Sequence, residues 1–333
     1  ILLDYKANRV VRTFPDLAGG SRNYPSSGSS VMLPLSAADA FRRVEVMVCG
    51  GAPHGAWQQV AKMAYPQALA TCGRMVITDP DPEWSMEEMP SGRVMGDMII
   101  LPTSEILIIN GAKQGTAGWG CATNPSLSPF LYNPSGPIGS RFWVLAASAI
   151  PRMYHSTAVL LPDGRVLVGG SNTNEGYTFS DVPYPTELRI EAFSPYYLDP
   201  SFDTDRPRIV GVPAEEIGYG ELFEVDFIVG SDGSSGNNDT VEFKVYAPSF
   251  STHSTQMNQR QLILEPVSVL VRNGGKNSSS SSSSSSFIVW RAMVKAPPSA
   301  IAAPPGYYLL YVVVNAAVPS AGSWVRFAPA AVA

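Results

Sequence analysis

The chain contains only three histidines in 333 residues, and two of them lie in segments that could supply metal ligands. His155 directly follows Tyr154 in PRMYHSTAVLLPDGRVLVGGSN, and His253 lies in SFSTHSTQMNQRQL. Imidazole nitrogens and a phenolate oxygen suit Cu(II), which prefers tetragonal N,O coordination. Tyr154, His155 and His253 are therefore candidate ligands of one copper ion. The alternative is that each histidine is an ordinary hydrogen-bonded residue, as we expect for His54 in the Gly-rich loop GGAPHGAW.

The candidate ligands need elements that bring them together. Adjacent residues on an extended strand point to opposite faces of a sheet, so Tyr154 and His155 can share an ion only if the backbone turns between them. Pro151, just before them, is consistent with a loop at that point. His253 is expected at the junction of two strands in a separate C-terminal domain. Sequence spacing alone leaves open whether that domain reaches Tyr154.

Residues 1–204 contain an internal repeat. Each repeat has a small or polar start, an apolar run ending in Leu-Pro, a turn, and a second apolar run ending in Gly-Gly or Asn-Gly. In the third repeat, Asp163-Gly164 between apolar runs predicts a β-hairpin. The Gly ends would let the backbone crowd close to a neighbouring unit. The three repeats are SSVMLPLSAADAFRRVEVMVCGGAP, GDMIILPTSEILIINGAKQG and HSTAVLLPDGRVLVGGSNTN.

This repeat is typical of a kelch-type β-propeller with four strands per blade. A further strand carrying an aromatic residue follows each hairpin, and the repeats exceed the kelch length of about 50 residues, so long loops are expected. Three blades do not close a ring, because a propeller needs typically four to eight blades. We therefore expect the propeller to be incomplete in this chain, with N-terminal blades and the true N-terminus upstream.

Residues 205–333 have a different pattern. Alternating or continuous β-runs are separated by Pro and Gly, which predicts an immunoglobulin-like β-sandwich without the cysteine pair of true immunoglobulin domains. The boundary is expected near Asp205-Arg206-Pro207. Within this domain the unbroken serine tract Ser278–Ser286 is expected to form a disordered surface loop, because serine side chains cannot build a core. The whole chain is thus predicted to be all-β.

Composition excludes several classes of function. The net charge is −5 and the pI about 5.3, so no basic field for nucleic acid exists. No run approaches the roughly 18 apolar residues of a membrane span. The three cysteines form no zinc pattern, and their odd number leaves at least one thiol free. Cys49 and Cys72 are read as core or disulfide residues, and Cys121 as a buried or loop thiol.

Four motifs together give the chain a resemblance to the plant glyoxal oxidases, relatives of galactose oxidase, over essentially its whole length. The family has a secreted seven-bladed propeller followed by an immunoglobulin-like domain. Its members are copper-radical oxidases, which oxidise an aldehyde or primary alcohol by two electrons and pass these to O2, giving H2O2. The motifs are RVMGDMIILP, RMYHSTAVLLPDGRVLVGGSN, APSFSTHSTQMNQRQL and PPGYYLLYVVVNAAVPSAGSWVRF.

The resemblance assigns roles to the candidate residues. Tyr154 becomes the axial tyrosine ligand and proton acceptor. His155 becomes a copper ligand, and His253 the second imidazole ligand, delivered by a loop of the C-terminal domain into the centre of the propeller.

The resemblance also implies a radical cofactor, an equatorial tyrosine joined by a thioether to a cysteine, in earlier blades upstream of this chain. Tyr24, in GGSRNYPSSGSSVMLP, stands in a comparable place at the head of its own blade. Its offset to the following Leu-Pro differs by two residues from that of Tyr154. This difference argues against Tyr24 as the radical site, so the Tyr–Cys pair is not located in this chain.

The predicted function is that of a copper-radical oxidase acting on a small aldehyde or alcohol and O2, located outside the cell or in the cell wall. The alternatives are a non-catalytic kelch propeller that binds a protein or glycan, and an inactive truncated homologue. The fold cannot separate these classes, because propellers host many activities. The substrate is left open, since it depends on the shape of the loops.

Overall fold

The computed structural model describes residues 1–213, 216–230, 240–272 and 288–328. The tract Ser278–Ser286 lies outside these residues. The described chain is almost entirely β-structure, as predicted. Its helical elements are the short helix α1 and three 3-10 turns, and no helix within the described ranges is long and apolar enough to cross a membrane. The helical elements are α1 (Ala56–Val60), η1 (Ala37–Asp39), η2 (Tyr196–Leu198) and η3 (Pro200–Phe202).

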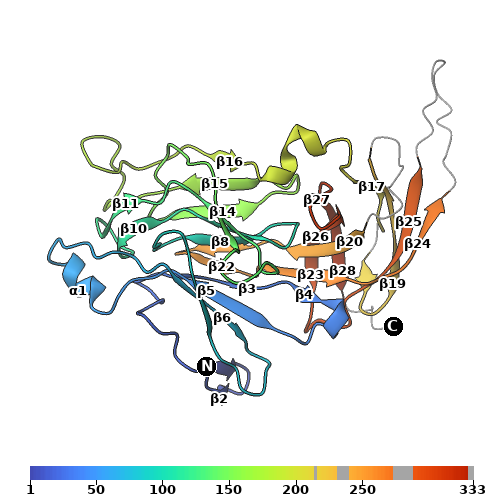
Figure 1. Cartoon of the computed structure of the whole chain (residues 1–333), viewed down its shortest axis with the longest axis horizontal. Helices are drawn as coiled ribbons and strands as arrows, with labels where there is room; N and C mark the ends of the chain where they lie inside the picture. Colours follow the sequence, from blue (N-terminus) through green and yellow to red (C-terminus); the bar gives the residue numbers. More distant parts are fainter. Residues whose placement is uncertain (214–215, 231–239, 273–287, 329–333) are drawn as a thin grey trace.

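The N-terminal part forms three antiparallel sheets, one for each sequence repeat (Figure 1). In each sheet the strands pair with their neighbours in chain order. Sheet one contains β3 (Ser29–Met32), β5 (Glu45–Cys49), β6 (Thr71–Val76) and β7 (Ser85–Glu88). Sheet two contains β8 (Asp97–Ile100), β9 (Ile106–Ile109), β12 (Phe130–Tyr132) and β13 (Phe142–Val144). Sheet three contains β14 (Ser156–Leu160), β15 (Val166–Gly170) and β16 (Glu191–Phe193).

The predicted hairpin and the third strand of each sheet are present. β12 and β16 carry aromatic residues as predicted, whereas β6 carries none, because Trp84 of that segment lies beyond the end of the strand. Gly164 has a φ of +87° in the turn between β14 and β15, a conformation that glycine adopts without steric cost. The predicted additional strands are β6, β12 and β16, which pair with the second strand of their own hairpins. Two small hairpins complete this part: β1 (Leu2–Asp4) with β2 (Arg9–Arg12), and β10 (Ala112–Gly115) with β11 (Ala122–Pro125).

The first strands of the three sheets lie side by side, with β8 between β3 and β14. A hairpin from the C-terminal part, β21 (Phe250–Thr252) and β22 (Thr255–Met257), packs against all three of these inner strands. Three sheets arranged in this way around a common centre are consistent with blades, and the propeller itself stays a prediction. The inner strands and the inserted hairpin are the elements that build the site.

The C-terminal part is the predicted two-sheet sandwich. The first sheet runs β17-β19-β25-β24, and the second runs β18-β28-β26-β20-β23-β4, with β27 paired to β26 (Figure 1). The first sheet is formed by β17 (Arg208–Gly211), β19 (Leu222–Ile228), β24 (Pro266–Arg272) and β25 (Val289–Lys295). The second is formed by β18 (Ile217–Gly218), β20 (Val241–Ala247), β23 (Arg260–Leu264), β26 (Gly306–Val314), β27 (Val318–Pro319), β28 (Ser323–Ala328) and β4 (Leu35–Ser36).

The second sheet of the sandwich is buried on both faces, because one face meets the other sandwich sheet and the opposite face meets the N-terminal sheets. Along β26 the side chains of Tyr308, Leu310 and Val312 belong to the sandwich core. The alternate residues Leu309, Tyr311 and Val313 belong to the N-terminal core. This two-sided burial explains the continuous apolar run GYYLLYVVV, since successive strand residues face opposite sides. Strand β4 from the N-terminal part joins this sheet parallel to β23.

Cys49 and Cys72 form a disulfide between the paired strands β5 and β6. Both cysteines are also buried. The prediction that they are core or disulfide residues is therefore confirmed. The bond joins residues separated by 23 positions, and a loop of this size is worth about 3 kcal/mol in the chain-entropy model. Disulfides of this kind persist in oxidising compartments.

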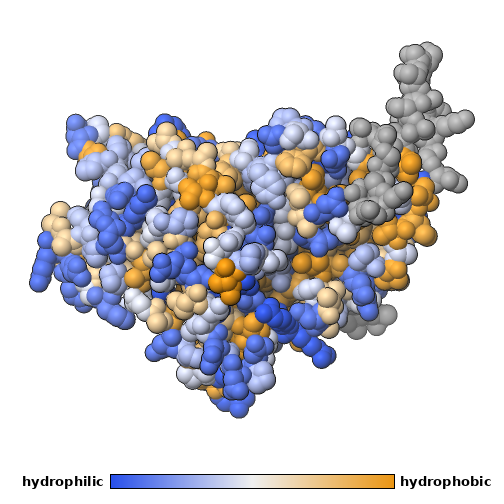
Figure 2. Space-filling model, in the orientation of Figure 1, coloured by the Kyte–Doolittle hydropathy of each residue, from blue (hydrophilic) through white to orange (hydrophobic). Residues whose placement is uncertain are grey.

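The edge strand β24 of the first sandwich sheet carries exposed apolar side chains. Val267, Leu270 and Val271 on β24 are 57%, 66% and 54% exposed. Figure 2 shows hydrophobic residues gathered at the end of the molecule where Figure 1 places β24 and β25. This patch lies at the opposite end of the sandwich from the inserted hairpin β21–β22.

Candidate metal centre

Four aromatic rings from three distant parts of the chain meet where the hairpin β21–β22 enters the centre of the three sheets. Tyr154 and His155 stack with ring centroids 3.8 Å apart. The His253 ring lies 5.7 Å from Tyr154 and 5.5 Å from His155, edge-on to both. Tyr24 completes the group, with its ring 5.9 Å from His253. The two parts of the chain therefore do bring together the residues that the sequence singled out.

A backbone turn lets the neighbours Tyr154 and His155 point the same way. His155 has a φ of +66°, which is uncommon for a residue with a side chain and occurs where the surroundings enforce it. Asn172 holds this turn from the end of sheet three. Its N–H donates to the carbonyl of Tyr154 (2.7 Å), and its own carbonyl lies 3.2 Å from Nδ1 of His155. The turn required by the sequence argument is present.

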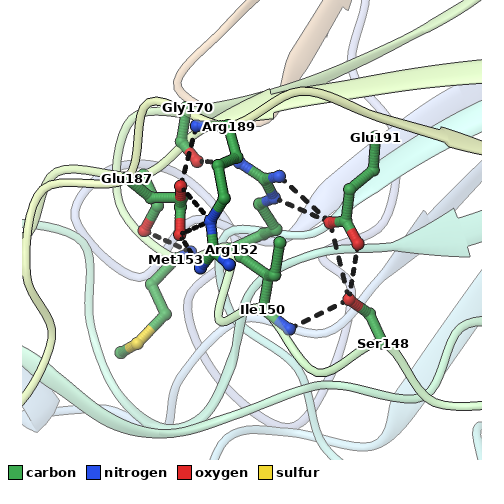
Figure 3. A network of polar contacts seen from close by, with 9 residues as sticks. Ser148, Ile150, Arg152, Met153, Gly170, Glu187, Arg189 and Glu191 are labelled. Carbon is green, nitrogen blue, oxygen red and sulfur yellow. Dashed lines mark hydrogen bonds and ion pairs between the residues drawn. The ribbon is translucent and has the colours of Figure 1, made fainter.

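Arg152 anchors the segment that leads into this turn (Figure 3). Its guanidinium donates to the carbonyl of Gly170 and forms an ion pair with Glu191 at 3.0 Å, and its side chain is only 3% exposed. Ser148 donates to Glu191 from the other side. One residue further on, the N–H of Met153 donates to Oγ of Ser171. Tyr154 is thus held by hydrogen bonds on both sides of its own position.

His253 lies at the tip of the hairpin β21–β22. Thr252 and Thr255 are the last paired residues, so His253 and Ser254 form a two-residue loop. Both have positive φ, 50° and 67°, as in a type I′ turn. Such turns favour Asn and Gly, so a histidine here is a conformational cost that the local environment must offset. Oγ1 of Thr252 lies 2.7 Å from Nδ1 of His253 and orients its ring.

Tyr24 and Tyr154 occupy equivalent positions in their repeats. One arginine recurs before the first strand of each sheet and donates to the carbonyl at the end of the second strand; the pairs are Arg22 with Gly50, Arg93 with Asn110, and Arg152 with Gly170. Two residues after these arginines stand Tyr24, Met95 and Tyr154.

The structure also places the Tyr24 hydroxyl 3.2 Å from the Tyr154 hydroxyl. The offset that argued against Tyr24 arises from the additional turn Pro25–Gly28, which separates Tyr24 from β3. The arginine, rather than the Leu-Pro pair, was the sequence signal that aligns the two tyrosines. Tyr24 is therefore a member of the cluster. Its distance in sequence from the Leu-Pro pair did not indicate this.

The local environment favours the neutral forms of Tyr154 and His155. Burial, together with the hydrogen bond and charge of Tyr24, raises the pKa of Tyr154 to about 12. Burial lowers the pKa of His155, the carbonyl of Asn172 opposes this effect, and the charge of His253 adds to the lowering. A neutral imidazole is the form that binds metals.

The donor set fits a copper ion. In each histidine Nδ1 is engaged by an oxygen, and in the described part of the chain Nε2 of neither ring has a hydrogen-bond partner. Metal-bound histidines almost always fix their other ring nitrogen in this way. No group of three or more His, Cys, Asp or Glu side chains suited to a metal exists among the described residues. A metal at this cluster would need the phenols as ligands, and mixed N,O donors suit Cu(II).

The remaining candidates lie apart from the cluster or at its border. His54 is exposed in the turn before α1 and makes no ring contact with the other histidines. Cys121 is a free, partly buried thiol that donates to the carbonyl of Trp119. Burial raises its pKa, and its charge contributes to the raised pKa of Tyr154, so this thiol lies near the cluster.

Two family models cover nearly all of the chain. The model described as glyoxal oxidase N-terminus matches residues 1–197, and the model described as galactose oxidase-like, early set domain matches residues 206–327. The second agrees with the immunoglobulin-like sandwich. Similar proteins include aldehyde oxidase GLOX1 of Arabidopsis thaliana, 50% identical over 269 residues, and aldehyde oxidase GLOX of Vitis pseudoreticulata, 47% identical over 260 residues.

The chain spans about half the length of these relatives. The alignment covers 79% of this chain and 43% of the Arabidopsis protein, and 78% and 48% for the Vitis protein. A galactose oxidase of Gibberella zeae is 24% identical over 235 residues. Among solved structures, a fungal alcohol oxidase of the AA5 family in complex with copper matches with a TM-score of 0.66 and 19% identity, covering 91% of this chain and 54% of that one.

Proposed function

Because this chain belongs to the glyoxal oxidase family, we propose that the protein containing it is a copper-radical oxidase of small aldehydes or primary alcohols. The observation that carries this proposal is the meeting of Tyr154, His155 and His253, with ring centroids between 3.8 and 5.7 Å apart. The two histidines lie 98 positions apart in sequence (253 − 155) and come from different parts of the fold. Relatives named aldehyde oxidase support the reaction class.

The proposed reaction balances with O2 as the oxidant. An aldehyde and water give a carboxylic acid, releasing two electrons and two protons, and O2 takes up both to become H2O2. For a primary alcohol the same two-electron loss gives the aldehyde. Bound copper would supply Lewis acidity toward the substrate hydroxyl and one of the two redox equivalents.

The residues of this chain would bind the copper ion and move the substrate proton. Nε2 of His155 and of His253 and the phenol oxygen of Tyr154 would hold the ion. A phenolate at Tyr154 would be a base placed to accept the proton of the substrate hydroxyl. The hydroxyl of Tyr24, at 3.2 Å, is the neighbouring group to which Tyr154 can donate.

The remaining parts of the proposal follow from the family. The second redox equivalent requires the Tyr–Cys thioether, which we expect in the portion of the longer relatives that this chain does not span. The three sheets are proposed to be blades of a kelch-type propeller. The disulfide Cys49–Cys72 supports an oxidising location outside the cell or in the cell wall.

The conformation of His253 at the tip of the hairpin β21–β22 favours an oxidase over a non-catalytic propeller. A histidine held at positive φ and aimed at a second histidine has no use in binding a protein or glycan at the propeller surface. Such strained residues gather at functional sites because the fold must stabilise them.

The proposal is tested by copper loading of the full-length protein and measurement of H2O2 release on small aldehydes. His253→Ala should weaken copper binding by at least 100-fold and abolish turnover, because a first ligand is lost. His54→Ala is the matched control, since His54 is exposed and outside the cluster. Full copper binding and turnover by His253→Ala would refute the assignment.

A further inference from the structure

Asp97 is a buried carboxylate that faces the His253 hairpin. It is the first residue of β8 and only 1% exposed. Within the described ranges it forms no ion pair, and its three hydrogen-bond partners are neutral. Burying a charge without an opposite charge is costly. The hydrogen bonds that the carboxylate accepts must therefore offset this cost.

The carboxylate holds both strands of the hairpin. Oδ1 of Asp97 accepts from Oγ of Ser251 at 3.0 Å and from Nε2 of Gln256 at 2.6 Å. Ser251 and Gln256 are direct cross-strand partners, one on β21 and one on β22. They form the pair next to Thr252 and Thr255, which close the loop of His253. A single oxygen atom of the N-terminal part therefore clamps the hairpin one pair below its tip.

The hairpin has little stability of its own. It has only three residue pairs, and an isolated two-stranded hairpin is marginally stable in water. Its end residues Phe250 and Met257 are 68% and 46% exposed, so apolar burial does little to fix them. The polar clamp is thus the side-chain contact that joins both strands of the hairpin to β8 close to its tip. A register shift of one residue would turn Ser251 or Gln256 away from Asp97.

Asn110 braces the clamp from behind. Its Nδ2 donates to Oδ2 of Asp97 at 2.8 Å, and its carbonyl accepts from the guanidinium of Arg93. All three residues are buried. The carboxylate therefore accepts three hydrogen bonds, two from the hairpin and one from its own sheet, and cannot swing away from the hairpin without breaking the third.

We propose that Asp97 is a positioning residue of the metal centre, whose carboxylate fixes the hairpin β21–β22 and thereby sets where the His253 imidazole lies relative to Tyr154 and His155. The consequence for copper rests on the proposed function. The clamp itself does not depend on a metal.

The test uses Asp97→Asn in the full-length protein, because this change keeps the shape of the side chain. The new Nδ2 group would face either Nδ2 of Asn110 or the donors of the hairpin. In both cases two hydrogen-bond donors would face each other, and at least one hydrogen bond would be lost. Hydrogen–deuterium exchange of residues 250–257 in the metal-free protein should become at least tenfold faster. The Cu(II) dissociation constant should rise by 10- to 100-fold, as for other groups that orient metal ligands, with a changed Cu(II) electron paramagnetic resonance spectrum.

A double exchange provides rescue. With Asn110→Asp added to Asp97→Asn, the amide at 97 can donate to the carboxylate at 110 while its oxygen still accepts from Ser251 and Gln256. Exchange rates and the copper spectrum should return toward those of the wild type. Gln261→Met is the matched control: it breaks equally buried bonds between the two parts, to Leu101 and Ser104, without touching the hairpin.

The outcomes separate the two proposals. If Asp97→Asn fails to fold, Gln256→Met removes one clamp donor and leaves Asp97 intact, and it should loosen the hairpin in the same direction. Wild-type exchange and copper spectra in these variants, or equal effects in Gln261→Met, would overturn the positioning role. Failure of the wild type to bind copper, with faster exchange still seen in Asp97→Asn, would refute the oxidase proposal and leave the clamp standing.

Discussion

At the scale of single residues, two buried ionisable side chains, Arg93 and Asp97, lie in the centre of this molecule and form no ion pair with each other. Arg93 donates to the carbonyls of Asn110 and Ser128 and lies over the ring of Phe130, and burial lowers its pKa to about 9. Burial raises the pKa of Asp97 to about 6, against the opposing hydrogen bonds from its partners. Both charged states are therefore maintained by neutral dipoles and a ring face rather than by an ion pair.

The raised pKa of Asp97 predicts a pH dependence of stability. The folded state binds this proton more tightly than the unfolded chain, whose carboxyl has the ordinary value of 3.8. The contribution of Asp97 to the free energy of unfolding is therefore complete below about pH 4 and is lost as the pH rises through about 6. Two pKa units correspond to at most about 3 kcal/mol.

Urea denaturation at about pH 4 and pH 7 checks this prediction. The wild type should lose stability relative to Asp97→Asn between the two values, because the variant carries no ionisable group there. Titration of all other groups cancels in this difference. A difference that stays constant with pH would contradict the prediction.

At the scale of elements, the Gly end of the first repeat brings two neighbouring sheets close together. Gly50 follows β5 with a φ of +72°, and a Cβ atom there would overlap the carbonyl of Arg93 in the next repeat. Gly169, in β15, has ordinary strand geometry, and the nearest atom to an added Cβ is 3.9 Å away. The two glycines look alike in sequence, yet only the first is required by contact between sheets.

Substitution of these glycines tests the contact. Gly50→Ala should lower the free energy of unfolding by about 3 kcal/mol or more, through overlap with backbone and an unfavourable φ. Gly169→Ala should change it by less than about 1 kcal/mol. Thermal unfolding followed by circular dichroism compares the two. Equal loss of stability in both variants would show that close packing is not the reason.

At the scale of the whole molecule, the two parts share a core. Tyr246, Leu309 and Tyr311 of the sandwich are buried among the residues of the N-terminal sheets, and Leu35 of the N-terminal part is buried in the sandwich core. The side-chain amide of Gln259 accepts from the N–H of Ile100 and donates to the carbonyl of Met98 along the free edge of β8. These contacts leave neither part with a complete core of its own.

The shared core predicts that both parts unfold together. Differential scanning calorimetry should give one transition whose calorimetric and van't Hoff enthalpies agree. Gln259→Ala should shift that single transition downward, because it leaves buried groups of β8 unpaired. Two resolved transitions, with only one affected by Gln259→Ala, would contradict a common unfolding unit.

Local patterns predicted the local structure. The Asp163-Gly164 turn and the third strand of each sheet depend on neighbours in the chain, and each is present. The turn at Tyr154-His155 followed from the geometry of a strand.

The clamp by Asp97 could not be read from the sequence. It joins residues 154 and 159 positions apart, and an Asp at the start of an apolar strand has no local signal. The alignment of Tyr24 with Tyr154 was not seen from the Leu-Pro pairs, since turn lengths vary between repeats while the arginine contact is kept. The roles proposed for Tyr154, His155 and His253 came from family resemblance, because the meeting of these residues depends on how the two parts pack.

The late position of the His253 hairpin in the chain has a consequence for synthesis. A ribosome releases the three sheets before it has made residues 250–257, so the nascent protein presents Tyr154 and His155 without their counterpart. Under the proposed function, capture of copper before the hairpin is made would thereby be disfavoured. Only a polypeptide in which residues 250–257 have been translated can bring His253 to Tyr154 and His155.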